Sequence, residues 1–245
     1  MLNQALRYRS VTELLAGEPG GRLLEVGSGS RGIRDLIDSR WTLTSLDRSF
    51  DDYGAARTGS GSGVDRVLGD VTALPFEDRT FDAVIALDLL EHVPAQSRAK
   101  ALEELARVAG RLAIVGCPCG RDALEADRRL ATRYERIRGG APAWLTEHLV
   151  NGFPSQAELA DGLSKHGEVT CFANESAAAH LLVSTLEALP ILWIISAAAA
   201  SALGSGKTNG RPCADVLRGR AATALRGGDR SPSYRTIAVL RRGPW

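Results

Sequence analysis

Short runs of valine, isoleucine and leucine alternate with helical patterns along the first half of the chain. The runs predict five β-strands, at residues 22–26, 42–47, 66–69, 81–87 and 111–116. Compact apolar runs of this kind suit strands that are buried on both faces of a sheet. Their alternation with helical segments is typical of a parallel sheet with crossover helices.

Helical patterns frame these strands. We expect helices over residues 4–16, 32–39 and 94–108. The third is amphipathic, because Leu102 and Leu105 share one face while Glu103 lies on the opposite face. The first half therefore predicts a layered α/β arrangement.

The second half of the chain is less regular. A charged stretch predicts a helix over residues 122–138, and the capping box of Ser155 and Glu158 begins another helix that runs to about Lys165. Two more strands are expected at residues 168–172 and 234–241. The result is a single seven-stranded α/β domain over residues 1–245. It has a helical cap inserted at residues 121–154, between residues 1–120 and a C-terminal half at residues 155–245.

Composition favours a soluble globular protein. The 245 residues carry a formal net charge of +1, which gives no general attraction to nucleic acid. We interpret the four cysteines as reduced thiols of a cytoplasmic protein, and no His or Cys cluster in the sequence predicts a zinc site, so no metal is expected. The N-terminus has no apolar signal-peptide core.

One apolar segment, at residues 181–203, complicates this interpretation. Its uncharged part, residues 188–203, is 16 residues long, whereas a bilayer span needs about 20. We expect a buried or interfacial helix and no transmembrane span, and peripheral membrane contact stays open.

A glycine-rich stretch, Glu25–Gly32, follows the first predicted strand. Glycines here allow a sharp turn and a close approach of a ligand to the backbone. Taken alone, the stretch fits a dinucleotide loop or an ordinary strand-to-helix turn. Asp47 ends the next strand, 20 residues after Gly27, where a carboxylate can accept hydrogen bonds from ribose hydroxyls. The pair indicates a nucleoside ligand without choosing the cofactor.

The segment Gly69–Asp82 indicates which cofactor is bound. An acidic residue, Asp70, directly follows the third strand and precedes a Leu-Pro-Phe turn. The fourth strand then leads into a Glu-His-Val segment that ends at Val93. In these motifs the sequence resembles the Rossmann-like (class I) S-adenosylmethionine-dependent methyltransferases, in particular their small-molecule "type 11" branch. The resemblance covers about residues 20–120. It implies a mostly parallel sheet with an antiparallel last strand, and S-adenosylmethionine as cofactor.

The resemblance also implies a role for each matching residue. Gly27, Ser28 and Gly29 would approach the methionine and ribose of the cofactor, and Glu25 would hold its amino end or the loop. The remaining implied contacts are to the ribose from Asp47, to the adenine from Arg48, Asp70 and Val71, and to the methionine from Leu87 and Asp88. Arg31 stands where many members have a third glycine, which comes one position later as Gly32.

Two histidines are candidates for the base that deprotonates the methyl acceptor. His92 follows the fourth strand, at the sheet edge where open α/β folds bind ligands, and the rival interpretation is that it packs against or caps the next helix. His148 lies in the cap, where its stretch resembles an "EH…GFP" segment of some members. Simple packing within the cap is the rival interpretation for His148.

Two other motifs predict no function. Gly204–Thr208 ends like a phosphate loop, but Ser201 stands where the leading glycine would be. The arginine pairs at residues 128–129 and 241–242 lack interleaved aromatics, so no nucleic-acid partner is expected.

The sequence therefore predicts an enzyme that methylates an oxygen or nitrogen of a small molecule of natural-product, lipid or glycan type. An apolar acceptor would suit the apolar segment. An NAD-dependent oxidoreductase and a non-catalytic module that binds S-adenosylmethionine are the alternatives. The acceptor and the oligomeric state are left open.

Overall fold

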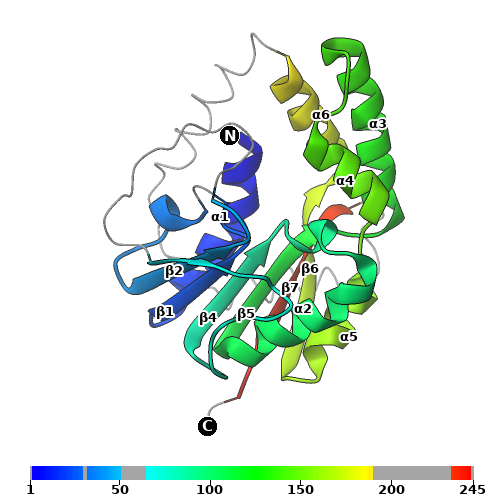
Figure 1. Cartoon of the computed structure of the whole chain (residues 1–245). Coiled ribbons are helices and arrows are strands. Elements are labelled where there is room, and N and C mark those ends of the chain that lie inside the picture. Colours follow the sequence, from blue (N-terminus) through cyan, green and yellow to red (C-terminus); the bar gives the residue numbers. More distant parts are fainter. Residues whose placement is uncertain (1, 30–31, 51–64, 190–232, 244–245) are drawn as a thin grey trace.

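A seven-stranded sheet forms the centre of the molecule (Figure 1). The computed structural model describes residues 2–29, 32–50, 65–189 and 233–243. Its strands are β1 (Gly21–Val26), β2 (Trp41–Asp47), β3 (Asp65–Leu68), β4 (Phe81–Leu87), β5 (Ala109–Pro118), β6 (Glu168–Ser176) and β7 (Ser233–Arg241). All seven predicted strands are confirmed, with ends that differ by a few residues.

The strand order across the sheet is β3-β2-β1-β4-β5-β7-β6. The first five strands pair in parallel, whereas β7 is antiparallel to both β5 and β6. The sheet is therefore mostly parallel with an antiparallel last strand, as the resemblance implied. The strand order reverses between β1 and β4, and ligands of open α/β sheets bind beside such a point, at the carboxyl ends of the strands.

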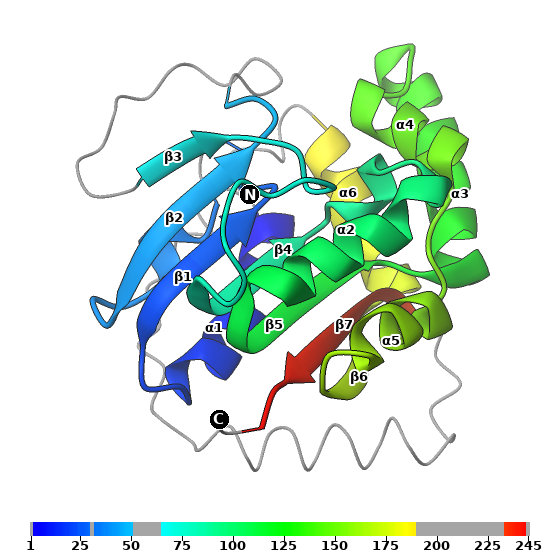
Figure 2. The same cartoon turned by 60° about the horizontal axis from the view of Figure 1, so that its bottom comes forward.

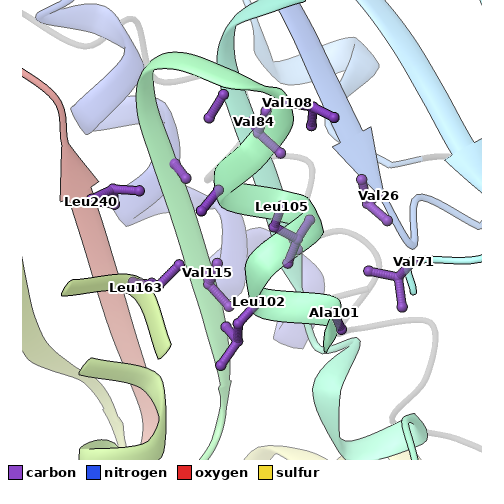
Figure 3. Close-up of a cluster of buried hydrophobic side chains, with 14 of the residues drawn as sticks. Val26, Val71, Val84, Ala101, Leu102, Leu105, Val108, Val115, Leu163 and Leu240 are labelled. Carbon is purple, nitrogen blue, oxygen red and sulfur yellow. The ribbon is translucent and has the colours of Figure 1, made fainter. Parts of the chain in front are cut away.

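Helices cover both faces of this sheet (Figure 2). The helix α1 (Leu2–Ala16) packs on one face, where Tyr8, Val11 and Leu15 belong to a buried cluster with strand residues. The helices α2 (Ala95–Val108) and α5 (Gln156–Ser164) cover the other face. There Leu102 and Leu105 of α2 point toward the side chains of β4 and β5 (Figure 3).

The predicted cap consists of two helices, α3 (Gly120–Arg138) and α4 (Ala143–Asn151), which gather with α6 (Ala177–Ala188) at one end of the sheet (Figure 1). Because α3 begins directly after β5, this end is the carboxyl edge of the parallel strands. The helix α4 packs against a 3₁₀ helix, η2 (Leu90–His92), that follows β4. These helices therefore lie at the carboxyl edge of the parallel strands, and their role as a cap over a ligand stays a prediction.

The expected helix over residues 32–39 is wrong. The structure has a single 3₁₀ turn there, η1 (Arg34–Leu36). Local hydrogen bonds outcompete a regular helix, because the Asp38 carboxylate accepts from the backbone N–H of Arg40 and forms the turn that enters β2.

The apolar segment at residues 181–203 is described only in part. Its first residues continue α6 to Ala188, and Leu182 and Leu186 of this helix are exposed. Residues 190–203 lie outside the described part of the chain. Among the described helices, none has the length and apolar character that crossing a bilayer requires.

Candidate active site

The glycine loop leaves β1 with backbone angles that suit glycine. Gly27 has a φ of +77° and Gly29 a φ of +54°, in the left-handed region that side chains disfavour. The backbone N–H of Gly27 donates to the carbonyl of Leu46 in β2 at 2.8 Å. A side chain at Gly27 would also meet Leu89, which follows β4, at 3.0 Å. The loop is therefore held closely between the ends of β2 and β4.

The buried Glu25 side chain holds this loop through hydrogen bonds. Its buried carboxylate accepts hydrogen bonds from the Tyr8 hydroxyl at 2.7 Å and from the backbone N–H of Ile33 at 2.9 Å. Burial raises the pKa of this carboxyl above its ordinary value, although both hydrogen bonds oppose the rise. Gly32 passes so close that a Cβ there would lie 2.1 Å from the carboxylate. The later glycine thus replaces the one that Arg31 displaces.

Asp47 links the second motif to the first. One of its carboxylate oxygens accepts from the backbone N–H of Gly29 at 2.8 Å, and the other accepts from Ser49 at 3.1 Å. Both bonds orient the carboxylate at the end of β2, beside the loop. A carboxylate in this position can also accept hydrogen bonds from the two hydroxyls of a ribose.

Asp70 occupies the corresponding place after β3. Its carboxylate accepts from the hydroxyl and the backbone N–H of Thr72, at 2.6 and 2.8 Å, and these two bonds lower its pKa. Arg48 approaches it at 3.8 Å, and the side chains of both are largely open to solvent. Val71 is buried beside them.

These groups fit the adenosyl part of S-adenosylmethionine. The glycine loop, Asp47 and Asp70 follow three adjacent strands, so they line one edge of the sheet in the order in which methionine, ribose and adenine follow one another. The loop offers close backbone approach, and the two carboxylates accept hydrogen bonds from hydroxyl and amino groups. The donor and acceptor chemistry of this edge matches the cofactor.

Asp88 after β4 forms a buried ion pair. Its carboxylate accepts two hydrogen bonds from Arg235 of β7, both at 2.7 Å, and lies 3.2 Å from Arg7. Although burial opposes it, the charge of Arg235 lowers the pKa of Asp88 to about 2. The neighbouring Leu87 side chain packs in the core. The predicted contact of Leu87 and Asp88 with the methionine stays a prediction.

The two predicted histidines come together beneath the cap. His92 ends η2 and His148 lies in α4, yet their Nε2 atoms are 3.4 Å apart. The Nδ1 atom of His92 lies 2.8 Å from the carboxylate of Glu147, and that of His148 lies 2.8 Å from the carboxylate of Asp127 in α3. Each ring is thus oriented by its own carboxylate. The Asp127 carboxylate also accepts from the hydroxyl of Tyr234 at 3.0 Å.

Glu91 lies between these rings and the core. Its side chain is fully buried, and neither carboxylate oxygen has a hydrogen-bond partner on another described residue. Burial raises the pKa of this carboxyl well above its usual range. One of its oxygens and one nitrogen from each of His92 and His148 all lie within 4.8 Å of one another.

A buried arginine joins the two segments that carry the histidines. The Nε of Arg98 donates to the carbonyls of Leu90 and Val93, on either side of His92, at 3.0 and 3.1 Å. Its Nη2 donates to the carbonyls of Asn151 and Gly152 at the end of α4, at 3.0 and 2.6 Å. Arg98 is therefore a positioning residue that holds η2 against α4.

Several residues of this site had no predicted role. Glu91 was part of the motif that ends at Val93, and its signal is a charged residue four positions after the end of a buried strand. Asp127 follows Ala123 by four residues and precedes Leu130 by three, so it lies on the apolar face of its helix. Arg235 is a charged residue in the buried part of its strand. Ionisable side chains in apolar positions are the shared signal.

Known proteins share both sequence and fold with this chain. Residues 24–114 match the family described as methyltransferase domain. Demethylmenaquinone methyltransferase of Mycolicibacterium paratuberculosis is 29% identical over 178 residues, which are 68% of this chain and 76% of that protein. The protein of the same name from Renibacterium salmoninarum is 33% identical over 111 residues, 44% of this chain and 45% of that protein.

A solved structure shows the same architecture. Phosphoethanolamine N-methyltransferase 2 of Haemonchus contortus, in complex with S-adenosyl-L-methionine, matches with a TM-score of 0.56 at 13% identity. The match covers 96% of this chain and 52% of that one, so the chain spans about half the length of this relative. At this identity the likeness concerns the fold. The matching domain at residues 24–114 makes the chain a methyltransferase that uses S-adenosylmethionine, and its fold is that of the Rossmann-like (class I) methyltransferases.

Proposed function

We propose that this enzyme methylates a hydroxyl oxygen of a small, apolar acceptor, such as a phenol or a quinol. The observation that carries the proposal is the pair of imidazoles at the carboxyl end of β4, each backed by a carboxylate. When bound, S-adenosylmethionine supplies an activated methyl group. The protein must then orient the acceptor and remove its proton.

The position of the pair supports this role. Leu89, three residues before His92, lies so close to Gly27 that a Cβ there would be 3.0 Å from it, which supports a position of His92 near the predicted methionine end of the cofactor site. The side chain of His92 is 28% exposed, whereas that of His148 is 7% exposed, so an acceptor reaches the pair from the side of His92. Burial lowers the pKa of His92, which favours a neutral ring that can take a proton.

The surroundings favour an apolar acceptor. Trp144 and Phe153 meet the His148 ring edge-on, with ring centroids 5.2 and 5.4 Å away. Aromatic walls with a few convergent polar groups are typical of sites for apolar small molecules. The curated relatives are named for demethylmenaquinone, an apolar small molecule, and this name supports the apolar character of the acceptor without bearing on which atom is methylated.

A deuterated methyl label tests the proposal. The enzyme is incubated with S-adenosylmethionine that carries a deuterated methyl group and with matched pairs of aromatic hydroxyl and amino compounds, naphthols and naphthylamines. Mass spectrometry then locates the label. We expect label on oxygen, and we expect His148→Asn to lower turnover while cofactor binding is kept. Label on nitrogen or ring carbon, or unchanged turnover of His148→Asn, contradicts the proposal.

The predicted cytoplasmic location and the single-domain organisation of the chain stay predictions. Peripheral membrane contact is a further hypothesis, favoured by the exposed Leu182 and Leu186 side chains of α6. Fractionation of expressed protein tests it, because contact with the membrane would place a share of the chain in the membrane fraction.

A further inference from the structure

We propose that Glu91, His92 and His148 bind one divalent transition-metal ion, which the sequence did not predict. Three ligand atoms, one ring nitrogen of each histidine and one carboxylate oxygen of Glu91, converge within 4.8 Å of one another near the carboxyl end of β4. Two imidazoles and a carboxylate are a ligand set that suits Zn²⁺ and related ions, with a further position left open. The ion itself is inferred from these contacts, and its role in activating a hydroxyl rests on the proposed function.

The geometry of the two rings is the first argument. Two imidazole nitrogens bound to one tetrahedral Zn²⁺, at about 2.0–2.1 Å each, lie roughly 3.3 Å apart. The Nε2 atoms of His92 and His148 are 3.4 Å apart. The Glu91 oxygen lies within 4.8 Å of a nitrogen of each ring, so binding of the ion would require this side chain to approach the rings.

The outer carboxylates are the second argument. A histidine that binds a metal usually donates its other ring N–H to a carboxylate or carbonyl, which fixes the tautomer and the ring orientation. Both rings have this arrangement, because Glu147 faces Nδ1 of His92 and Asp127 faces Nδ1 of His148, each at 2.8 Å. With both Nδ1 atoms acting as donors, the neutral rings direct two lone pairs at each other across the 3.4 Å gap. A cation between them removes this repulsion.

The unpartnered carboxylate of Glu91 is the third argument. A fully buried carboxylate without a hydrogen-bond partner is costly unless it is protonated, paired or bound to a metal. The Nε2 atoms of the neighbouring His92 and His148 rings offer lone pairs to Glu91 and no N–H group. A divalent ion satisfies Glu91 and both rings together. The ion and its three ligands carry one net positive charge, which favours an anionic oxygen at the open position.

This charge connects the ion to the proposed reaction. A hydroxyl bound to a divalent ion loses its proton at a much lower pH than the free hydroxyl does. The partly exposed side of His92 gives a hydroxylated acceptor access to the open position. The three residues would hold the ion, the ion would favour the deprotonated acceptor, and the proton would pass to water on the exposed side of His92. The acceptor oxygen would then bond to the methyl carbon as the carbon–sulfur bond of S-adenosylmethionine breaks, which releases S-adenosylhomocysteine.

Metal binding is tested without cofactor or acceptor. Chelator-treated enzyme is titrated calorimetrically with Zn²⁺, and Co²⁺ is added to a second sample to record its ligand-field absorption. We expect one ion per chain, a higher melting temperature with Zn²⁺, and a tetrahedral or five-coordinate Co²⁺ spectrum. Glu91→Gln and His148→Asn should each weaken binding by more than about tenfold, and Glu147→Gln by about tenfold.

Two control variants test whether the metal ion binds to residues outside the cluster. His166→Asn removes a histidine outside the cluster, and Cys119→Ser removes a thiol that lies 3.8 Å from the Cys117 thiol. Neither should change the affinity. No binding of either ion, or binding that survives in both Glu91→Gln and His148→Asn, overturns the inference. If the ion binds but no hydroxyl compound is methylated, the proposed function fails instead, and methylation by metal-free enzyme would mean that only the metal inference fails.

A folding control keeps the test decisive. Circular dichroism of Glu91→Gln and His148→Asn shows whether these variants are folded. Glu147 is 42% exposed, so Glu147→Gln is expected to fold normally whatever happens to the buried ligands. An unchanged Zn²⁺ affinity of a folded Glu147→Gln would contradict the outer-carboxylate argument.

Discussion

The carboxylate of Asp47 accepts a hydrogen bond from the backbone N–H of Gly29 at 2.8 Å, so the end of β2 is tied directly to the glycine loop after β1. The contact joins the two parts of the site that are assigned to the ribose and to the methionine of the cofactor. It orients the carboxylate before a ligand arrives. The loop and the acidic residue therefore act as one unit.

Replacing Asp47 by alanine should weaken S-adenosylmethionine binding by one to two orders of magnitude. The estimate follows from the loss of hydrogen bonds to a charged group, worth about 1.5–3 kcal/mol. Calorimetric titration of the variant measures the change. Asp161→Ala removes an exposed carboxylate of α5 and is the matched control. Equal affinity of the two variants would refute a ribose contact at Asp47.

Gly32→Ala should lower the free energy of unfolding by about 2–4 kcal/mol. The alanine would be strained at a φ of +54°, which costs roughly 1–2 kcal/mol, and its Cβ would displace the Glu25 carboxylate and weaken its two hydrogen bonds. Denaturant unfolding measures the loss. Gly139→Ala has a φ of +76° and open space around the added Cβ, so it isolates the strain. If both variants lose the same stability, the contact with Glu25 contributes nothing.

Removing the guanidinium of Arg98 should both destabilise the protein and impair turnover. Arg98→Met leaves four carbonyl groups of η2 and of the end of α4 without their donor, and we expect a loss of about 2–4 kcal/mol in unfolding free energy. Because the histidines lose their relative positions, kcat should fall more than the affinity for S-adenosylmethionine does. Urea unfolding and steady-state kinetics measure the two effects.

The control for Arg98 is an exposed arginine. Arg129 pairs with Glu125 one helical turn away, with both side chains mostly open to solvent. Arg129→Met should cost only about 0.3–0.5 kcal/mol. A comparable loss in both variants would show that Arg98 does not hold the two segments together.

The ion pair of Asp88 and Arg235 predicts a pH dependence of stability. The pKa of Asp88 is lowered to about 2 in the folded protein, below its ordinary value of 3.8. A lowered folded-state pKa means that the contribution is fully present above about pH 4 and is lost as the pH falls toward 2. Unfolding of the enzyme and of Asp88→Asn, compared from pH 7 down to pH 3, should give a stability difference that narrows below pH 4. A difference that stays constant or widens would contradict the lowered pKa.

The sequence carried most of the information about the sheet and the cofactor edge. Buried strands appear as apolar runs, and Asp47 and Asp70 directly follow such runs, so their places could be predicted from one chain. The acceptor side was harder. His92 and His148 could be named, but they are 56 positions apart, and only the packing of α4 on η2 brings their Nε2 atoms together.

The charged residues that contact the two histidines show why the rest of the site could not be predicted from the sequence. Asp127, Glu147 and Arg98 act on the histidines from three helices, and no local pattern records which helix faces meet. The helix expected at residues 32–39 failed for a different reason, because the local hydrogen bond from the backbone N–H of Arg40 to the Asp38 carboxylate forms a turn there. Periodicity describes an element, whereas these contacts depend on how the elements are packed.

Calorimetric titration of the unmodified enzyme with S-adenosylmethionine, S-adenosylhomocysteine and NAD tests the cofactor assignment most directly. The edge formed by the glycine loop, Asp47 and Asp70 predicts binding of the first two ligands, one per chain, and no binding of NAD. Binding of NAD in preference to S-adenosylmethionine, or failure to bind either sulfur-containing ligand, would contradict the assignment.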